Sequence, residues 1–210
     1  MIWRPLGRLY FLTMDGAPID HLQQVEAACR AGIRWIQLRM KEAPDEEVRR
    51  VALAAKKITD ASDCALIIND RVEVAAQVLA NGVHLGKQDM PVSAARRILG
   101  EDYIIGGTAN TIEDIREHYR QGADYIGLGP YRYTTTKKNL SPILGLEGYR
   151  RIMRLLDQER LSIPVVAIGG IEMKDAGLLS DTGLHGVAFS GMLVHAGDRA
   201  GVVESLNKLF

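Results

Sequence analysis

Short apolar runs rich in β-prone residues alternate along this chain with longer amphipathic stretches. Each run is nearly continuous in apolar residues, as expected for strands that are buried on both faces of a parallel sheet. The runs occupy residues 8–13, 35–40, 65–70, 82–86, 103–108, 125–130, 165–170 and 186–191. In the intervening stretches, such as 43–61 and 111–123, apolar residues recur at helical spacing. The pattern predicts eight consecutive strand–helix units.

Eight such units are the number that closes a (β/α)₈ barrel, since each parallel strand is reached by a right-handed helical crossover. We therefore predict an α/β protein that forms a single (β/α)₈ (TIM) barrel domain over residues 1–210. The alternative is a doubly wound open sheet, but no G-x-G-x-x-G follows the first predicted strand. Neither a linker nor a low-complexity stretch indicates a second domain.

Charge is balanced along the chain, with 26 lysine and arginine residues against 26 aspartate and glutamate residues. A broad basic surface for a nucleic-acid backbone or an anionic membrane is therefore not expected. An anionic ligand must be bound by a local group of residues. The sequence thus predicts small-molecule partners and leaves a homodimer open.

The two cysteines and the amino-terminal residues indicate a cytoplasmic protein. Cys29 and Cys64 are far apart and show neither C-x-x-C nor zinc-ligand spacing, so we expect reduced thiols. Charged, proline and glycine residues at 4–8 interrupt the apolar start before a signal-peptide core or membrane span could form.

Cationic and amide side chains gather at the end of the second predicted strand. Gln37, Arg39 and Lys41 are spaced two apart, so their side chains point to the same side of a strand. In a barrel of this kind the carboxyl ends of the strands carry the site. The three residues suit a polyphosphate, although Gln37 and Arg39 could instead belong to an ion-pair layer inside the barrel.

Two carboxylates follow the next two predicted strands. The third strand ends in Asn69 and Asp70, and the loop after the fourth reaches Asp89. Two carboxylates at neighbouring strand ends are a common way to hold Mg²⁺, with water and a substrate phosphate completing its coordination. The alternative is that each aspartate caps the helix that follows it.

Small residues end the last two predicted strands. Gly169 and Gly170 follow the seventh strand, and Ser190 and Gly191 end the eighth. This is the usual position of a barrel's phosphate site, where backbone N–H groups and a helix N-terminus meet the anion.

The longest irregular segment, residues 131–148, follows the sixth predicted strand. It carries Thr134, Thr136 and Lys137, and a loop of this length within a compact domain is usually functional. Hydroxyl and ammonium groups can enclose a phosphate, whereas a solvated surface loop is the alternative. Histidines show no metal-ligand spacing, and His84 is interpreted as structural.

Taken together, several motifs resemble the thiamine-phosphate synthase family. They are QLRMK, IINDR, GVHLGKQD, GLGPYRYTTTKK, AIGGI and GVAFSG, which occur in family order from residue 37 to residue 191. The resemblance implies the same eightfold barrel, Mg²⁺ as cofactor, and a transferase reaction. In that reaction an aminopyrimidine diphosphate is coupled to a thiazole phosphate and pyrophosphate is released.

The resemblance also implies roles for individual residues. The pyrimidine diphosphate would be held by Gln37, Arg39, Lys41 and Asn69, with Mg²⁺ on Asp70 and Asp89 and with Lys137 contacting the diphosphate. The thiazole phosphate would be held by Thr134, Thr136, Gly170 and Ser190. Thr108 replaces a family serine near the diphosphate or the pyrimidine and keeps the hydroxyl group.

Two departures from the family pattern leave alternatives open. Where the family has S-x-H this chain has Thr108-Ala109-Asn110, and where it has V-S-A this chain has Phe189-Ser190-Gly191. The related thiazole tautomerases are the first alternative, disfavoured because Asn110 is not an imidazole and because the diphosphate-binding residues are complete. A non-catalytic binder of thiamine precursors is the second.

Overall fold

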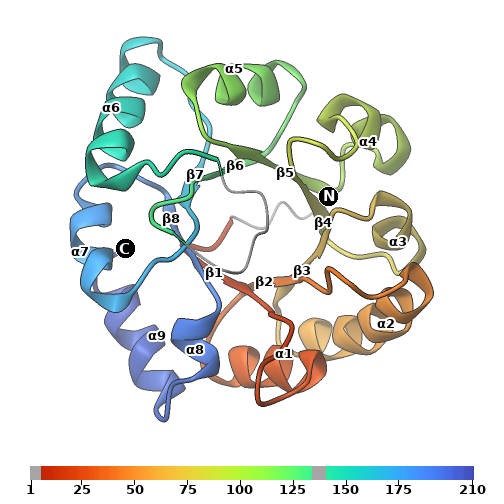
Figure 1. Ribbon diagram of the computed structural model, residues 1–210. Coiled ribbons are helices and arrows are strands. Elements are labelled where there is room, and N and C mark those ends of the chain that lie inside the picture. Colours follow the sequence, from red (N-terminus) through yellow and green to blue (C-terminus); the bar gives the residue numbers. More distant parts are fainter. Residues whose placement is uncertain (1–5, 134–140) are drawn as a thin grey trace.

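The computed structural model describes residues 6–133 and 141–210 of the chain. Eight parallel strands pair in chain order, and β8 closes the ring against β1 (Figure 1). The strands are β1 Leu9–Leu12, β2 Trp35–Leu38, β3 Ala65–Asn69, β4 Gly82–Leu85, β5 Ile104–Ala109, β6 Tyr125–Leu128, β7 Val165–Ala167 and β8 Gly186–Phe189. The predicted (β/α)₈ barrel is confirmed, and each strand lies within its predicted run, except that β5 extends one residue beyond.

Helices surround the barrel on the outside (Figure 1). They are α1 His21–Arg30, α2 Asp45–Ala61, α3 Val72–Gln77, α4 Val92–Leu99, α5 Ile112–Arg120, α6 Gly145–Gln158, α7 Met173–Ser180, α8 Gly191–Val194 and α9 Arg199–Asn207. Local sequence sets some boundaries: α5 begins after Thr111, whose side chain accepts from the Asp114 N–H in a capping box. None of the helices in the described ranges is long and apolar enough to cross a membrane.

Aromatic side chains fill the barrel interior near the amino ends of the strands. Tyr10 stacks on Trp35 with ring centroids 3.9 Å apart, and Tyr125 meets Trp35 edge-on at 4.7 Å. Gly106 provides the space, because a Cβ atom there would lie 2.1 Å from the ring of Tyr125. The interior is thus a packed core rather than a pore, and a ligand cavity is confined to one end.

A second apolar layer lies between the strands and the surrounding helices, where Phe11, Ile36 and Ile68 are fully buried. Because neighbouring residues of a strand point to opposite sides, this layer and the interior are filled by alternate residues. Cys29 and Cys64 are buried free thiols of the outer layer.

Candidate active site

A cavity of about 710 Å³ lies at the carboxyl ends of the strands. Every predicted site residue within the described ranges lines it: Gln37, Arg39, Lys41, Asn69, Asp70, Asp89, Thr108, Gly169, Gly170, Ser190 and Gly191. Thr134, Thr136 and Lys137 lie outside the described residues. Residues from six strand ends therefore share one cavity, as the barrel topology requires.

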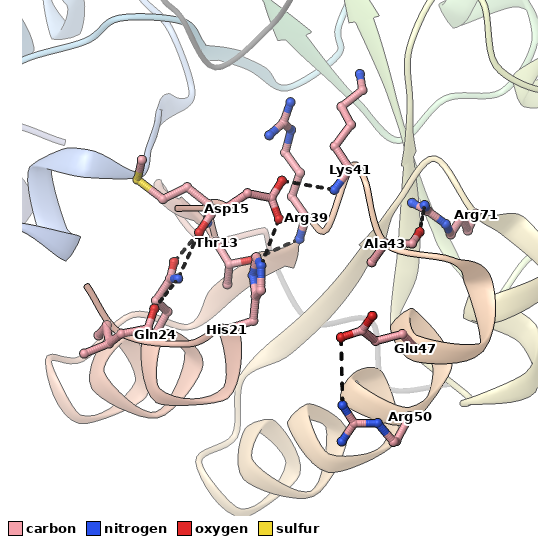
Figure 2. Close-up of polar contacts among 12 residues, drawn as sticks. Thr13, Asp15, His21, Gln24, Arg39, Lys41, Ala43, Glu47, Arg50 and Arg71 are labelled. Carbon is pink, nitrogen blue, oxygen red and sulfur yellow. Dashed lines mark hydrogen bonds and ion pairs between the residues drawn. The ribbon is translucent and has the colours of Figure 1, made fainter. Parts of the chain in front are cut away.

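The end of β2 presents Arg39 and Lys41 beside the loop after β1 (Figure 2). The Arg39 N–H donates to Thr13 Oγ1 at 2.9 Å, and the Lys41 N–H donates to Asp15 Oδ2 at 3.2 Å. Burial lowers the pKa of Arg39, while the negative charges of Asp15 and Asp70 oppose that shift. Arg39 is thus a mostly buried cation with the carboxylates of Asp15 and Asp70 nearby, and its side chain faces the cavity.

Two further residues brace this end of β2. His21, the first residue of α1, lies with Nδ1 2.8 Å from Thr13 Oγ1 and Nε2 3.1 Å from Asp15 Oδ1 (Figure 2). The imidazole therefore joins the two residues that receive the Arg39 and Lys41 N–H groups. Neither Asp15 nor His21 was predicted as part of the site, because their role depends on contacts between separate loops.

Asp70 and Asp89 face each other across the ends of β3 and β4. Burial and the neighbouring Asp89 carboxylate raise the pKa of Asp70 to about 6, and Lys41 lowers it by a smaller amount. Gly86 N–H donates to Asp89 Oδ2 at 2.6 Å. The helices that follow, α3 and α4, have no side-chain cap, so the alternative role of the two aspartates as helix caps is wrong.

The carboxylate pair fits a divalent cation. Two carboxylates in contact repel each other, and a cation between them would remove that repulsion. Within the described residues no group of three or more histidine, cysteine, aspartate or glutamate side chains could hold a metal ion. The pair would thus supply two ligands and leave the remaining positions to water and substrate oxygens.

Two buried amide atoms at the cavity lack a hydrogen-bond partner within the described part of the chain. They are Oε1 of Gln37 and Nδ2 of Asn69, and their residues are 1% and 6% exposed. A buried polar group without a partner costs about 1–3 kcal/mol. The two residues line the cavity, so a bound ligand is the natural partner for these atoms.

The turn after β7 has the backbone of an anion site. Gly169 and Gly170 both have positive φ values, 88° and 72°. Arg132 holds the turn from the loop after β6, donating to the Gly170 carbonyl at 3.2 Å and to both Asp175 carboxylate oxygens at 2.7 and 2.8 Å. Successive backbone N–H groups in such a turn form a concavity that suits phosphate.

The eighth strand completes this side of the cavity. Ser190 precedes the short helix α8 and makes no capping hydrogen bond with its side chain. Ser190 lines the same cavity as the Gly169–Gly170 turn. Sequence reasoning missed Arg132 and Asp175, because an arginine in a polar loop and an aspartate at a helix start carry no signal that the two meet.

Asn110 is not among the residues that line the cavity. Its Nδ2 donates to the carbonyl groups of Gly129 and Pro142 at 2.9 and 2.8 Å, joining the two ends of the loop after β6. The residue that departs from the family histidine therefore has a structural role in this chain.

The comparisons with known proteins agree with this geometry. Residues 9–193 match the family described as thiamine monophosphate synthase. The chain belongs to this family. A thiamine-phosphate synthase from Bacteroides thetaiotaomicron is 50% identical over 192 residues, which are 91% of this chain and 92% of the relative. One from Flavobacterium johnsoniae is 41% identical over 202 residues, 96% of this chain and 95% of the relative.

A solved structure supports the same assignment. The thiamine phosphate pyrophosphorylase from Pyrococcus furiosus superposes with a TM-score of 0.83 at 34% identity, covering 96% of this chain and 94% of that chain. The protein is thus an enzyme of the thiamine-phosphate synthase type, a transferase, as the motifs predicted.

Proposed function

We propose that this cavity joins the methylene carbon of an aminopyrimidine diphosphate to the nitrogen of a thiazole phosphate. The C–O bond to the diphosphate breaks, pyrophosphate leaves, and a C–N bond forms to give thiamine phosphate. The observation that carries the proposal is the pairing of Arg39 and Lys41 with Asp70 and Asp89 around one cavity.

In this proposal the leaving diphosphate lies between β2 and the carboxylate pair. Arg39 and Lys41 supply positive charge, and Asp70 and Asp89 would hold Mg²⁺. The metal ion would neutralise part of the charge that develops on the departing group. Lys137, which falls outside the described residues, remains a sequence-based prediction for the same task.

The pyrimidine diphosphate would be bound by the two buried amide atoms that lack a partner among the described residues. Gln37 Oε1 suits the exocyclic amino group of the pyrimidine, because a carboxamide oxygen only accepts hydrogen bonds. Asn69 Nδ2 suits an acceptor such as a diphosphate oxygen. Each contact removes an unsatisfied buried polar atom, so both favour ligand binding.

The thiazole phosphate would lie at the opposite side of the cavity. Gly170 and Ser190 offer backbone N–H groups and a hydroxyl, and Gly169 and Gly191 allow close approach of the backbone. Thr134 and Thr136 are predicted from the sequence to complete this site. The two phosphorylated substrates then meet across the cavity.

Catalysis in this arrangement rests on positioning and on stabilisation of the leaving group. Among the described residues that line the cavity, His84 is the one histidine, and its two ring nitrogens are hydrogen-bonded to Tyr125 and Thr108 inside the barrel. It is therefore poorly placed to act as a general base. A reaction in which the electron-rich pyrimidine assists departure of pyrophosphate requires no such base.

Two assays on one preparation test the proposal. Purified protein is given both substrates with Mg²⁺ while pyrophosphate release is followed, and is separately given the thiazole carboxylate phosphate alone while its isomerisation is followed. We expect coupling and little isomerisation. Isomerisation without coupling would favour the tautomerase alternative, and inactivity in both assays would favour a binding protein.

A further inference from the structure

A continuous chain of hydrogen bonds runs through the barrel interior between two residues of the cavity. Gln37 Nε2 lies 2.7 Å from the Tyr10 hydroxyl, which lies 2.8 Å from the Tyr125 hydroxyl. The Tyr125 hydroxyl lies 2.9 Å from His84 Nδ1, and His84 Nε2 lies 3.0 Å from Thr108 Oγ1. All five residues are at most 9% exposed.

The donors and acceptors along this chain have a defined direction. The amide nitrogen of Gln37 only donates, so the Tyr10 oxygen accepts there. Among the described residues, Tyr125 is the one remaining partner of the Tyr10 hydroxyl, so Tyr10 donates its proton to Tyr125. Burial raises the pKa of both tyrosines, which keeps both hydroxyl groups neutral.

The next two hydrogen bonds in the chain are made by the ring nitrogens of His84. Because Tyr125 accepts from Tyr10, its own proton is donated to His84 Nδ1, which must be unprotonated. A neutral imidazole then carries its proton on Nε2 and donates to Thr108 Oγ1. The Thr108 hydroxyl proton is left to point into the cavity, which Thr108 lines.

The orientation of one amide therefore sets the polarity at the other end. With Gln37 Oε1 facing the cavity, Thr108 is a donor toward the ligand. Rotation of the Gln37 amide by half a turn would place Oε1 against Tyr10 and reverse every hydrogen bond in the chain. Thr108 would then donate to His84 and present only lone pairs to the ligand.

We propose that Tyr10, Tyr125 and His84 are positioning residues whose hydrogen-bonded chain holds Gln37 as an acceptor and Thr108 as a donor toward the substrate. The chain thereby selects a ligand with an N–H donor at Gln37 and an oxygen or nitrogen acceptor at Thr108. An aminopyrimidine diphosphate has both groups. This assignment of the ligand rests on the proposed function, but the direction of the chain does not.

The tautomer of His84 tests the chain without any substrate. In the ¹⁵N NMR spectrum of the histidine-labelled full-length protein, with the signal assigned by loss in His84→Gln, we expect a neutral imidazole protonated at Nε2. A neutral imidazole protonated at Nδ1, or an imidazolium, would overturn the proposal. Inactivity of the enzyme would leave this readout unaffected, so the two proposals fail separately.

Gln37→Glu tests the coupling between the two ends. An ionised carboxylate only accepts hydrogen bonds, so Tyr10 must donate to it and the chain must reverse. We expect His84 to become protonated at Nδ1 as the introduced carboxyl group ionises. The ¹³C chemical shift of the carboxyl group reports its ionisation. An ionised carboxyl group beside an unchanged Nε2–H tautomer would refute the coupling.

Tyr125→Phe cuts the chain while leaving Gln37 and Thr108 in place. We expect the KM for the pyrimidine diphosphate to rise about tenfold, as for loss of one well-formed hydrogen bond, while the KM for the thiazole phosphate changes less than about twofold. Tyr149→Phe is the matched control, because Tyr149 is a fully buried tyrosine whose hydroxyl group donates to the Leu128 carbonyl outside the chain. A change in neither KM, or an equal change in both, would contradict the proposal.

Discussion

Asp70→Asn should stabilise the metal-free protein while abolishing its activity. Asp70 lies beside Asp89, and its backbone has a positive φ of 62°. Asparagine tolerates this conformation as well as aspartate does. The substitution therefore removes one of two facing charges with little backbone strain.

The size of the effect follows from the pKa of Asp70, which is raised from 3.8 to about 6. Two pKa units correspond to about 3 kcal/mol of differential stability between the protonated and ionised forms. Because Asp70 is partly exposed and solvent screens the repulsion, we expect a gain of roughly 1–3 kcal/mol at about pH 8. Loss of a metal ligand should reduce turnover to background.

The pH dependence shows whether the ionisation of Asp70 is responsible for the difference in stability. A raised pKa in the folded state means that the wild-type protein loses stability as the pH rises from 3.8 through about 6, as Asp70 ionises. Below 3.8 the carboxyl group is protonated in the folded and unfolded states, so the variant has no advantage there. The difference between the two proteins should therefore grow with pH and level off above about 7.

Urea unfolding in EDTA at several pH values measures this difference. Asp63→Asn is the matched control, because Asp63 also has a positive φ, 53°, but is exposed and far from the carboxylate pair. Because Asp63 is exposed, we expect Asp63→Asn to change the free energy of unfolding by less than about 1 kcal/mol. An Asp70→Asn protein that is no more stable than wild type at pH 8 would show that neither burial nor the neighbouring Asp89 makes the ionised Asp70 unfavourable in the folded protein.

Chelation with EDTA should abolish turnover and added Mg²⁺ should restore it; full activity in excess EDTA would refute the metal assignment. Asn110→Ala should lower the free energy of unfolding by about 2 kcal/mol or more, because the Gly129 and Pro142 carbonyl groups lose their donor. Urea unfolding measures this loss of stability, and an unchanged unfolding midpoint would contradict the prediction. Gly170→Ala should raise the KM for the thiazole phosphate about tenfold or more, because the added Cβ would lie 2.5 Å from Cγ of Arg132 and the backbone φ is 72°. Steady-state kinetics should show an unchanged KM for the pyrimidine diphosphate. An equal effect on both substrates would argue against a local phosphate site.

The order of strands and helices could be predicted from the sequence because it depends on local periodicity. Continuous apolar runs such as 65–70 are typical of strands buried on both faces, and the Thr111 capping box marks the start of α5. Eight repeats of one unit then limit the topology, since parallel strands require right-handed crossovers. The positions of the strand ends in turn predicted which polar residues lie together at the cavity.

The supporting contacts of the site could not be predicted in this way. Asp15 and His21 brace the end of β2, and Arg132 meets Asp175 across a separation of 43 residues. None of these contacts has a characteristic spacing: Asp15 meets Lys41, and Arg132 meets Asp175, between loops of different strand–helix units, while His21, at the start of α1, lies six residues from Asp15 in the loop before it. Only the closing of the barrel places those loops against one another.

The sequence by itself determined the barrel, the edge of the barrel that carries the site, and the residue types that surround the cavity. The tertiary structure decided the surroundings of those residues: the raised pKa of Asp70, the structural role of Asn110, and the chain of hydrogen-bonded side chains between Gln37 and Thr108. Periodicity is a local property of the chain and can be read along it. Burial, charge repulsion and hydrogen-bond direction depend on neighbours that are distant in sequence, so they exist only once the fold has formed.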